Sequence, residues 1–68
     1  MKHEDSARYI KEGEVSGITG LALQTLRNYR AKGIGPVYYR IGRSVRYPLA
    51  GVYSWIEGFR VQRQVQSR

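Results

Sequence analysis

The first periodic run of apolar side chains lies in residues 12–19. Val15 and Ile18 are one helical turn apart there, and Glu12 and Glu14 supply negative charge where a helix dipole is positive. Two glycines weaken the helical tendency of the segment, because glycine loses more backbone freedom on folding than other residues. The pattern still predicts a short helix over residues 12–19.

A second helix is predicted over residues 22–32. Gly20 separates it from the first helix, Leu21 gives it an apolar anchor, and Gly33 follows its last turn, where glycine commonly ends helices. Two short helices joined through a glycine turn form a helix-turn-helix pattern. Because Ala22 stands where a Ser or Thr cap is common, we expect the first turn to be frayed or displaced by a residue.

The second helix has two distinct sides when it is projected at about 100° per residue. Leu26 and Tyr29 fall on the inner side. Asn and Gln pair bidentately with adenine edges in the major groove of DNA, and Arg reaches guanine or phosphate. An ordinary solvated helix face carries the same residue types, so this helix alone leaves both interpretations open. The outer side consists of Gln24, Arg27, Asn28 and Ala31.

After a loop rich in glycine and proline, the chain alternates in the manner of a β-hairpin. We expect a three-residue loop at residues 42–44, which pairs Arg40 with Arg46 and Tyr39 with Tyr47 and gives one apolar and one basic face. The alternative is a two-residue loop, which sets Tyr39 opposite Arg46.

The basic face of this expected hairpin is suited to an anion. Arg40 and Arg46 repel each other when they lie directly opposite, and this cost points to an external partner such as phosphate. Arg43 at the tip is placed to enter a narrow minor groove. Tyr38 shares the basic face, where its hydroxyl can donate a hydrogen bond to phosphate.

A third helix is predicted after Pro48, which suits a first helical turn. Val52, Trp55, Ile56 and Phe59 follow the i, i+3, i+4, i+7 pattern of a stripe that packs on a core. Base stacking is the alternative role for the two aromatic residues, but their aliphatic neighbours favour core packing.

Charge distribution narrows the function. The 68 residues carry a net charge of +7, and the segment from Val15 to Ile56 contains no Asp or Glu. A solubilising surface mixes both signs, so a basic segment without acids predicts a polyanionic partner. The basic residues of this segment are Arg27, Arg30, Lys32, Arg40, Arg43 and Arg46.

Composition excludes several other classes. The sequence has no cysteine, and its single histidine lies near the start, so we expect no enzyme, no metal site and no cofactor. Residues 1–8 are expected to be a flexible leader and residues 61–68 a basic tail, which leaves residues 9–60 as one DNA-binding domain. Because no secretory signal or membrane-spanning apolar run is present, we expect no membrane association and a cytoplasmic location.

Short pieces from Tyr9 to Phe59 match a known family in their order and spacing. They are Glu14-Val15, Gly20-Leu21, Thr25-Leu26-Arg27, Gly33-Ile34-Gly35-Pro36, Ile41-Gly42-Arg43, Arg46-Tyr47 and Trp55-Ile56. With these pieces the chain resembles the small MerR-like winged helix-turn-helix proteins, namely phage and plasmid excisionases and AlpA-type regulators. The resemblance implies an α+β, mostly helical fold, with a two-stranded β-hairpin wing and a C-terminal helix.

The resemblance also implies a function. Excisionases are recombination directionality factors: several copies bind neighbouring sites, bend the DNA and recruit a tyrosine integrase, so that excision is favoured. It therefore implies double-stranded DNA, further copies of the chain and an integrase as partners in a bacterial host cell, with no catalysis. An AlpA-like transcriptional regulator is the alternative. A small RNA or single-strand binding protein is a lesser one, because most aromatic residues are assigned to the core.

The candidate site residues form three groups. The recognition helix contributes Gln24, Thr25, Arg27, Asn28 and Arg30, and the wing contributes Tyr38, Arg40, Arg43, Ser44 and Arg46. Arg60 at the end of the domain, together with Arg63 and Arg68 in the tail, is a candidate contact for a neighbouring copy or an integrase. A tail without any partner is the alternative.

Overall fold

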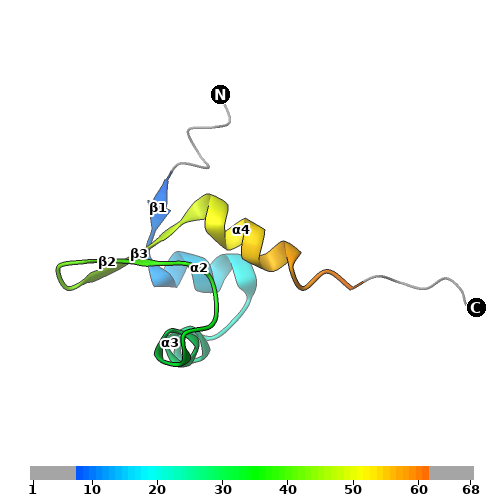
Figure 1. Cartoon of the computed structure of the whole chain (residues 1–68), viewed down its shortest axis with the longest axis horizontal. Coiled ribbons are helices and arrows are strands. Elements are labelled where there is room, and N and C mark those ends of the chain that lie inside the picture. Colours follow the sequence, from blue (N-terminus) through cyan, green and yellow to red (C-terminus); the bar gives the residue numbers. More distant parts are fainter. Residues whose placement is uncertain (1–7, 62–68) are drawn as a thin grey trace, which may run out of the picture.

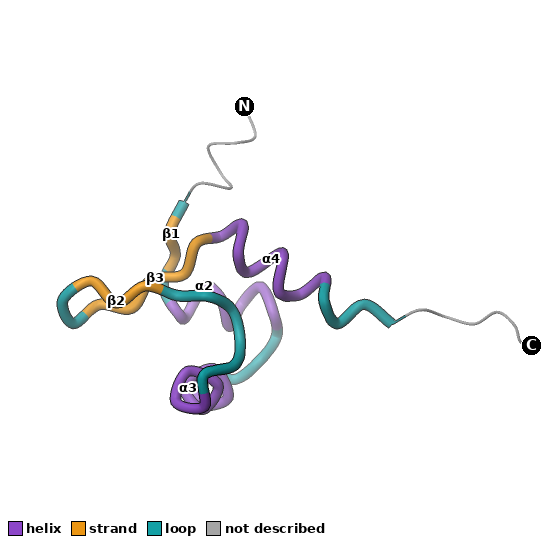
Figure 2. Tube along the Cα trace, viewed as in Figure 1, coloured by secondary structure: helices purple, strands orange, loops and turns teal. Residues whose placement is uncertain are grey.

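The computed structural model describes residues 8–61, and this part of the chain is an α+β fold with three helices and a three-stranded antiparallel sheet (Figures 1 and 2). The predicted roles of residues 1–7 and 62–68 lie outside the described residues. The elements in chain order are β1 (Tyr9–Ile10), α2 (Glu12–Thr19), α3 (Leu23–Lys32), β2 (Tyr39–Ile41), β3 (Ser44–Pro48) and α4 (Leu49–Glu57).

The first two predicted helices are confirmed, and one boundary moves. α2 has the predicted bounds and ends at Gly20, whose φ of 80° lies in the left-handed region that favours glycine. α3 begins at Leu23, because Ala22 is extended and provides no side-chain cap. Gly33 ends α3 with a φ of 74°. The positions of Gly20 and Gly33 therefore determine where α2 and α3 end, as the sequence predicts.

β3 is the central strand of the sheet, and the prediction of a two-stranded hairpin missed β1. β1 pairs with β3 so that Tyr9 lies opposite Pro48 and Ile10 opposite Tyr47. A strand of two residues is too short to give an alternating pattern, so periodicity could not reveal it. Pro48 ends β3 and immediately precedes α4, instead of lying in the first turn of that helix.

The hairpin loop has two residues, Gly42 and Arg43, so the prediction of three is wrong. Tyr39 lies opposite Arg46 in the observed register. Gly42 has a φ of 65°, whereas Arg43 has no positive φ, which is the pattern of a type II′ turn with glycine first. Arg40 and Arg46 therefore lie on opposite faces of the hairpin. Repulsion between them is no longer an argument for an anion.

The shorter loop also exchanges the faces of two tyrosines. Tyr38, predicted to be exposed, is half-buried on the inner face, with its ring centroid 5.9 Å from that of Tyr47. Tyr39, predicted to point inward, is 50% exposed on the outer face, where its ring centroid lies 5.6 Å from that of Tyr9. A shift of register by one residue moves every side chain of a strand to the other face, and this explains both corrections.

The core lies between the inner face of the sheet and the helices. In the predicted stripe of the third helix, Val52 is buried and Ile56 packs partly against the core, while Trp55 is half-buried. Phe59 lies beyond the end of α4 and is 64% exposed, so its predicted core role is wrong. The buried apolar side chains are Ile10, Val15, Leu26, Tyr47, Leu49 and Val52.

The elements are spread in three directions. In Figure 1 the β2–β3 hairpin extends to the left, α4 extends to the right, and α3 is seen end-on beneath them. Within the described residues, none of the helices has the length and apolar character needed to cross a membrane. This arrangement leaves one side of α3 and the tip of the hairpin free of other elements (Figure 2).

Candidate nucleic-acid interface

The outer face of α3 is exposed as the projection predicts. Gln24, Arg27, Asn28 and Ala31 are all exposed. The Nε2 atom of Gln24 donates a hydrogen bond to Oδ1 of Asn28 at 3.1 Å, which links the two amides one helical turn apart. Gln24 keeps its carbonyl oxygen and Asn28 keeps both N–H groups for other partners. The pair can therefore still present acceptors and donors to a base edge.

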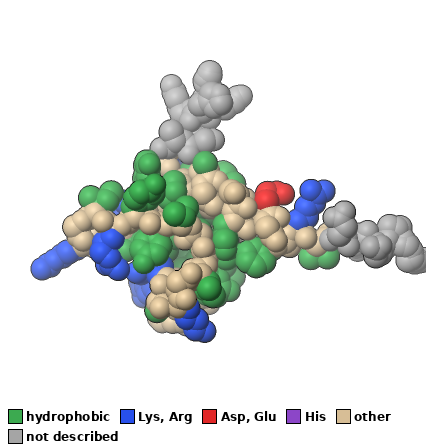
Figure 3. Space-filling model, in the orientation of Figure 1, with side chains coloured by type: hydrophobic (Ala, Val, Ile, Leu, Met, Phe, Trp, Pro, Cys, Tyr) green, Lys and Arg blue, Asp and Glu red, His purple; other side chains and the backbone are tan. Residues whose placement is uncertain are grey.

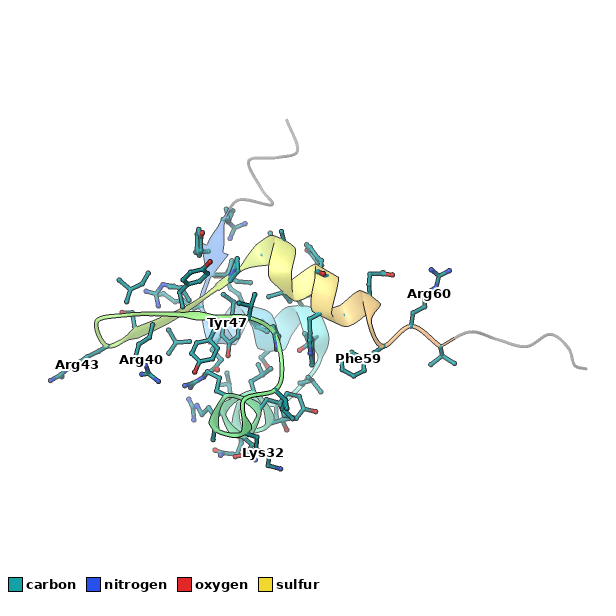
Figure 4. The ribbon with its side chains drawn as sticks, in the orientation of Figure 1. Lys32, Arg40, Arg43, Tyr47, Phe59 and Arg60 are labelled. Carbon is teal, nitrogen blue, oxygen red and sulfur yellow. The ribbon has the colours of Figure 1, made fainter. Side chains whose placement is uncertain are left out.

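Lys32 continues this face, and the candidate residues did not include it. It follows Gln24 and Asn28 at intervals of four residues, so all three lie on the same side of α3. Lys32 is exposed and points away from the rest of the domain (Figure 4). An i, i+4 count extended to the end of the helix would have identified it.

Arg30 lies elsewhere than predicted. Its side chain is only 20% exposed, and its Nε and Nη2 atoms donate hydrogen bonds to the Glu12 carboxylate at 2.8 and 3.2 Å. Its guanidinium also lies 5.7 Å from the ring centroid of Tyr38. The contacts with Glu12 and Tyr38 hold Arg30 inside the domain and away from the exposed face of α3. Thr25 is half-buried at the edge of the outer face.

The hairpin residues divide into two groups. Arg43 is exposed and points outward from the tip, and Arg40 is exposed on the side of the hairpin where α3 lies (Figure 4). Arg46 is half-buried on the opposite face, and its Nη1 atom donates a hydrogen bond to the carbonyl of Val45 at 2.9 Å. Ser44 is exposed next to the tip. Only Arg40 and Arg43 therefore extend the surface of α3.

Positive charge gathers along this side of the molecule. Figure 3 shows Lys and Arg atoms over the end of the hairpin and around α3, whereas acidic atoms are visible on this face only beside α4. Glu14 is paired with Arg8 at 3.1 Å, and Glu12 is 13% exposed. Of the described carboxylates, these two are thus largely neutralised by arginine. A polyanion approaching α3 and the hairpin tip would meet mainly cations.

Arg60, the first candidate of the tail group, is exposed at the end of the molecule opposite the hairpin (Figure 4). Arg63 and Arg68 lie outside the described residues. The structure therefore places Arg60 far from the surface formed by α3 and the hairpin.

Glu12 connects three elements, a role that sequence analysis missed. Its Oε2 atom accepts hydrogen bonds from Arg30 of α3 and, at 2.5 Å, from the hydroxyl of Tyr47 in β3. Its Oε1 atom lies 3.7 Å from Nε of Arg27. These partners, residues 27, 30 and 47, follow Glu12 by 15 to 35 residues in the sequence. No local sequence pattern reports such a cluster.

The contacts in this cluster shift the pKa values of Glu12 and Tyr47 in opposite directions. The hydrogen bond from Arg30 lowers the pKa of Glu12, and the bond from Tyr47 acts in the same direction, while burial opposes them. Burial raises the pKa of Tyr47, and the neighbouring Glu12 carboxylate raises it further. Near neutral pH Glu12 is therefore an anion that accepts hydrogen bonds from both partners, and Tyr47 is neutral.

Acid is expected to destabilise the domain through Glu12. Because the folded pKa of Glu12 lies below the unfolded value of about 4.3, its stabilising effect is complete above that value and is lost as the pH falls through the folded pKa. The free energy of unfolding, measured by urea titration from pH 7 to pH 3, should fall steeply only in the acidic part of this range. Glu12→Gln should flatten that fall, and Glu14→Gln should keep most of it. Equal profiles for the wild type and Glu12→Gln would contradict this role.

The chain has no match among models of known protein families and none among curated proteins.

Proposed function

We propose that the chain binds double-stranded DNA sequence-specifically, as a winged helix-turn-helix domain. α3 would be the recognition helix in the major groove, and the β2–β3 hairpin would be the wing on the adjacent minor groove or backbone. The observation that carries the proposal is the exposed Gln24–Asn28 amide pair on a helix face that also bears Arg27 and Lys32. Amides are suited to adenine edges, and cations beside them are suited to phosphates.

The hairpin adds a second point of contact to this proposal. Arg43 projects from the tip, and Arg40 faces the side of α3. The two contact regions, α3 and the hairpin, are separated along one side of the domain. They therefore fit an extended ligand that can contact both, such as a DNA duplex. In this arrangement the base edges would be contacted from α3 and the phosphates mainly from the arginines.

Within DNA binding, we propose that the chain acts as an excisionase that bends attachment-site DNA and directs a tyrosine integrase towards excision. The support is the resemblance of the short sequence pieces named above. An AlpA- or MerR-like transcriptional regulator is the alternative and would use the same surface. Enrichment from a random duplex library distinguishes the two. Closely spaced direct repeats bound cooperatively would favour the excisionase, and a single isolated site would favour the regulator.

Side-chain replacements should separate base contacts from phosphate contacts. Asn28→Ala should cost about 1 to 3 kcal/mol on the enriched duplex and little on a random duplex, since a base contact is lost. Arg43→Ala should weaken both duplexes alike and reduce the slope of log affinity against log salt by about 0.9. Fluorescence anisotropy titration measures each value.

Arg46→Ala is the matched control for Arg43→Ala. It removes the same charge from the same hairpin, but from the face opposite α3, where the guanidinium is bonded to a backbone carbonyl. The affinity should therefore change less for Arg46→Ala than for Arg43→Ala. Equal losses would mean that net charge, and not the position of the tip, governs binding.

One observation favours a second candidate function, single-stranded nucleic-acid binding. Tyr9 and Tyr39 are 55% and 50% exposed on the outer face of the sheet, whereas the sequence predicts that most aromatic residues lie in the core. Exposed aromatic rings on a sheet can stack on unpaired bases. Competition between a duplex and its separated strands decides between the two functions. Tighter binding of the single strand, lost in Tyr39→Ala, would support this candidate and overturn duplex recognition.

A further inference from the structure

Glu12 lies at the contact between the body of the domain and α3. Its carboxylate accepts two hydrogen bonds from Arg30 and one from Tyr47, and it is 13% exposed. Arg30 is tied by two of its N–H groups in a bidentate pair, the most directional ion pair available to arginine. A guanidinium held in this way and 20% exposed is unavailable to an outside anion.

The contact between Glu12 and Arg27 is different. Their closest atoms are 3.7 Å apart, which is beyond a good hydrogen-bond distance, and the Arg27 side chain is 53% exposed. Arg27 is thus attracted towards the domain without being bonded to it. It also lies on the outer face of α3, beside the Gln24–Asn28 pair. A phosphate that contacts Arg27 must compete with the Glu12 carboxylate for the same cation.

We propose that Glu12 is a positioning residue that limits the nonspecific affinity of this domain for DNA by competing with phosphate for Arg27. The inference rests on the proposed DNA-binding function and deepens it. Without the carboxylate, α3 would offer phosphates an additional unrestrained cation irrespective of base sequence. With it, a larger part of the affinity depends on contacts to base edges.

The physical basis is the sequence independence of phosphate contacts. Each lysine or arginine that neutralises a phosphate adds about 0.9 to the salt slope and strengthens binding to every sequence alike. Discrimination between sites depends on the difference between specific and nonspecific affinity. An internal carboxylate that competes for an interface cation therefore weakens nonspecific binding without removing a base contact.

Two isosteric variants on the same helix test the inference. Glu12→Gln removes the carboxylate charge but keeps an oxygen that can accept from Arg30 and Tyr47. Glu14→Gln makes the same change in net charge at an exposed residue whose partners are Arg8 and the backbone N–H of Lys11. Affinity for a random 20-base-pair duplex is measured by anisotropy between about 50 and 200 mM salt, the range over which phosphate contacts change affinity strongly.

The expected result is that Glu12→Gln binds the random duplex about threefold more tightly than Glu14→Gln at low salt, with a slope steeper by about 0.9. Adding Arg27→Gln to Glu12→Gln should remove this gain. Equal affinities and slopes for the two single variants would overturn the inference, because the effect would then be one of net charge. A gain that survives in Glu12→Gln/Arg27→Gln would also overturn it.

Failure of the inference can be distinguished from failure of the proposed function. If the wild type binds no duplex in these titrations, DNA binding itself fails and the inference falls with it. If the wild type binds and the two glutamate variants are alike, only the inference fails. A purely structural role for Glu12 would lower the midpoint of thermal unfolding without steepening the salt slope, which would likewise overturn it.

If Glu12→Gln does not fold, two single variants of the otherwise wild-type protein test the same inference. A restrained Arg27 should contribute less to random-duplex affinity than Arg43, which projects freely from the hairpin tip. Arg27→Gln should therefore reduce that affinity less than Arg43→Gln does. An equal or larger loss for Arg27→Gln would show that Glu12 does not restrain it.

Discussion

Replacing Tyr47 with alanine is expected to leave the domain largely unfolded at room temperature. Tyr47 is fully buried in the central strand, packs against Tyr38, and donates the hydrogen bond that connects β3 to Glu12. Loss of a buried aromatic side chain costs about 3 to 5 kcal/mol. A domain of this size has a total stability of about the same magnitude. Far-UV circular dichroism and a urea titration measure the loss.

Two other tyrosine variants separate packing from hydrogen bonding. Tyr47→Phe keeps the ring and removes only the hydroxyl, so it should cost about 1 to 3 kcal/mol by leaving Glu12 with one donor fewer. Tyr39→Ala removes an aromatic ring from the same sheet, but from its outer face, where the ring is 50% exposed. It should cost clearly less than Tyr47→Ala. A loss for Tyr39→Ala that matches or exceeds that for Tyr47→Ala would contradict the observed register of the hairpin.

The helices could be predicted from sequence because their signals are local. Val15 and Leu26 mark the inward sides by helical spacing, and both are buried. Gly20 and Gly33 mark the ends, where the backbone takes the left-handed conformation. Each of these properties depends on residues within about one turn, so no knowledge of the tertiary structure was needed.

The sheet could be predicted only in part, because its register depends on a loop with two possible lengths. Gly42 is compatible with a two-residue and a three-residue connection, and the choice decides the face of every side chain in β2. The sequence favours the three-residue loop because that loop places Tyr39 and Tyr47 on one apolar face. The fold instead buries Tyr38 with Tyr47 and leaves Tyr39 beside Tyr9 of a strand that was not predicted.

In the candidate site, too, the sequence predicts what depends on local position and misses what depends on tertiary contacts. The exposure of Gln24, Arg27 and Asn28 followed from their positions on α3, and it is confirmed. The position of Arg30 could not be inferred from α3 alone, because its partner Glu12 is 18 residues away and reaches it only through packing of α2 against α3. Composition gave the sign of the charge near the site, and tertiary contacts decide which arginines remain free.

Leu26→Ala is expected to detach α3 from the core and to cost about 3 kcal/mol, within the usual range of about 2 to 5 for a buried leucine. Leu26 is 1% exposed and is the one residue of α3 buried in the core. The helix is short and has no side-chain N-cap, so most of its stability must come from this packing. The midpoint of thermal unfolding should fall by more than ten degrees, at about 4 to 8 °C per kcal/mol.

Leu23→Ala is a control in the same helix with the same change of side chain. Leu23 is 39% exposed in the first turn of α3, so its truncation leaves little cavity and should cost well under about 1 kcal/mol. If DNA binding depends on a fixed α3, Leu26→Ala should also lose its preference for the enriched duplex while Leu23→Ala keeps it. A folded Leu26→Ala variant with unchanged preference would show that the position of α3 is maintained by the Glu12–Arg30 pair and not by the core.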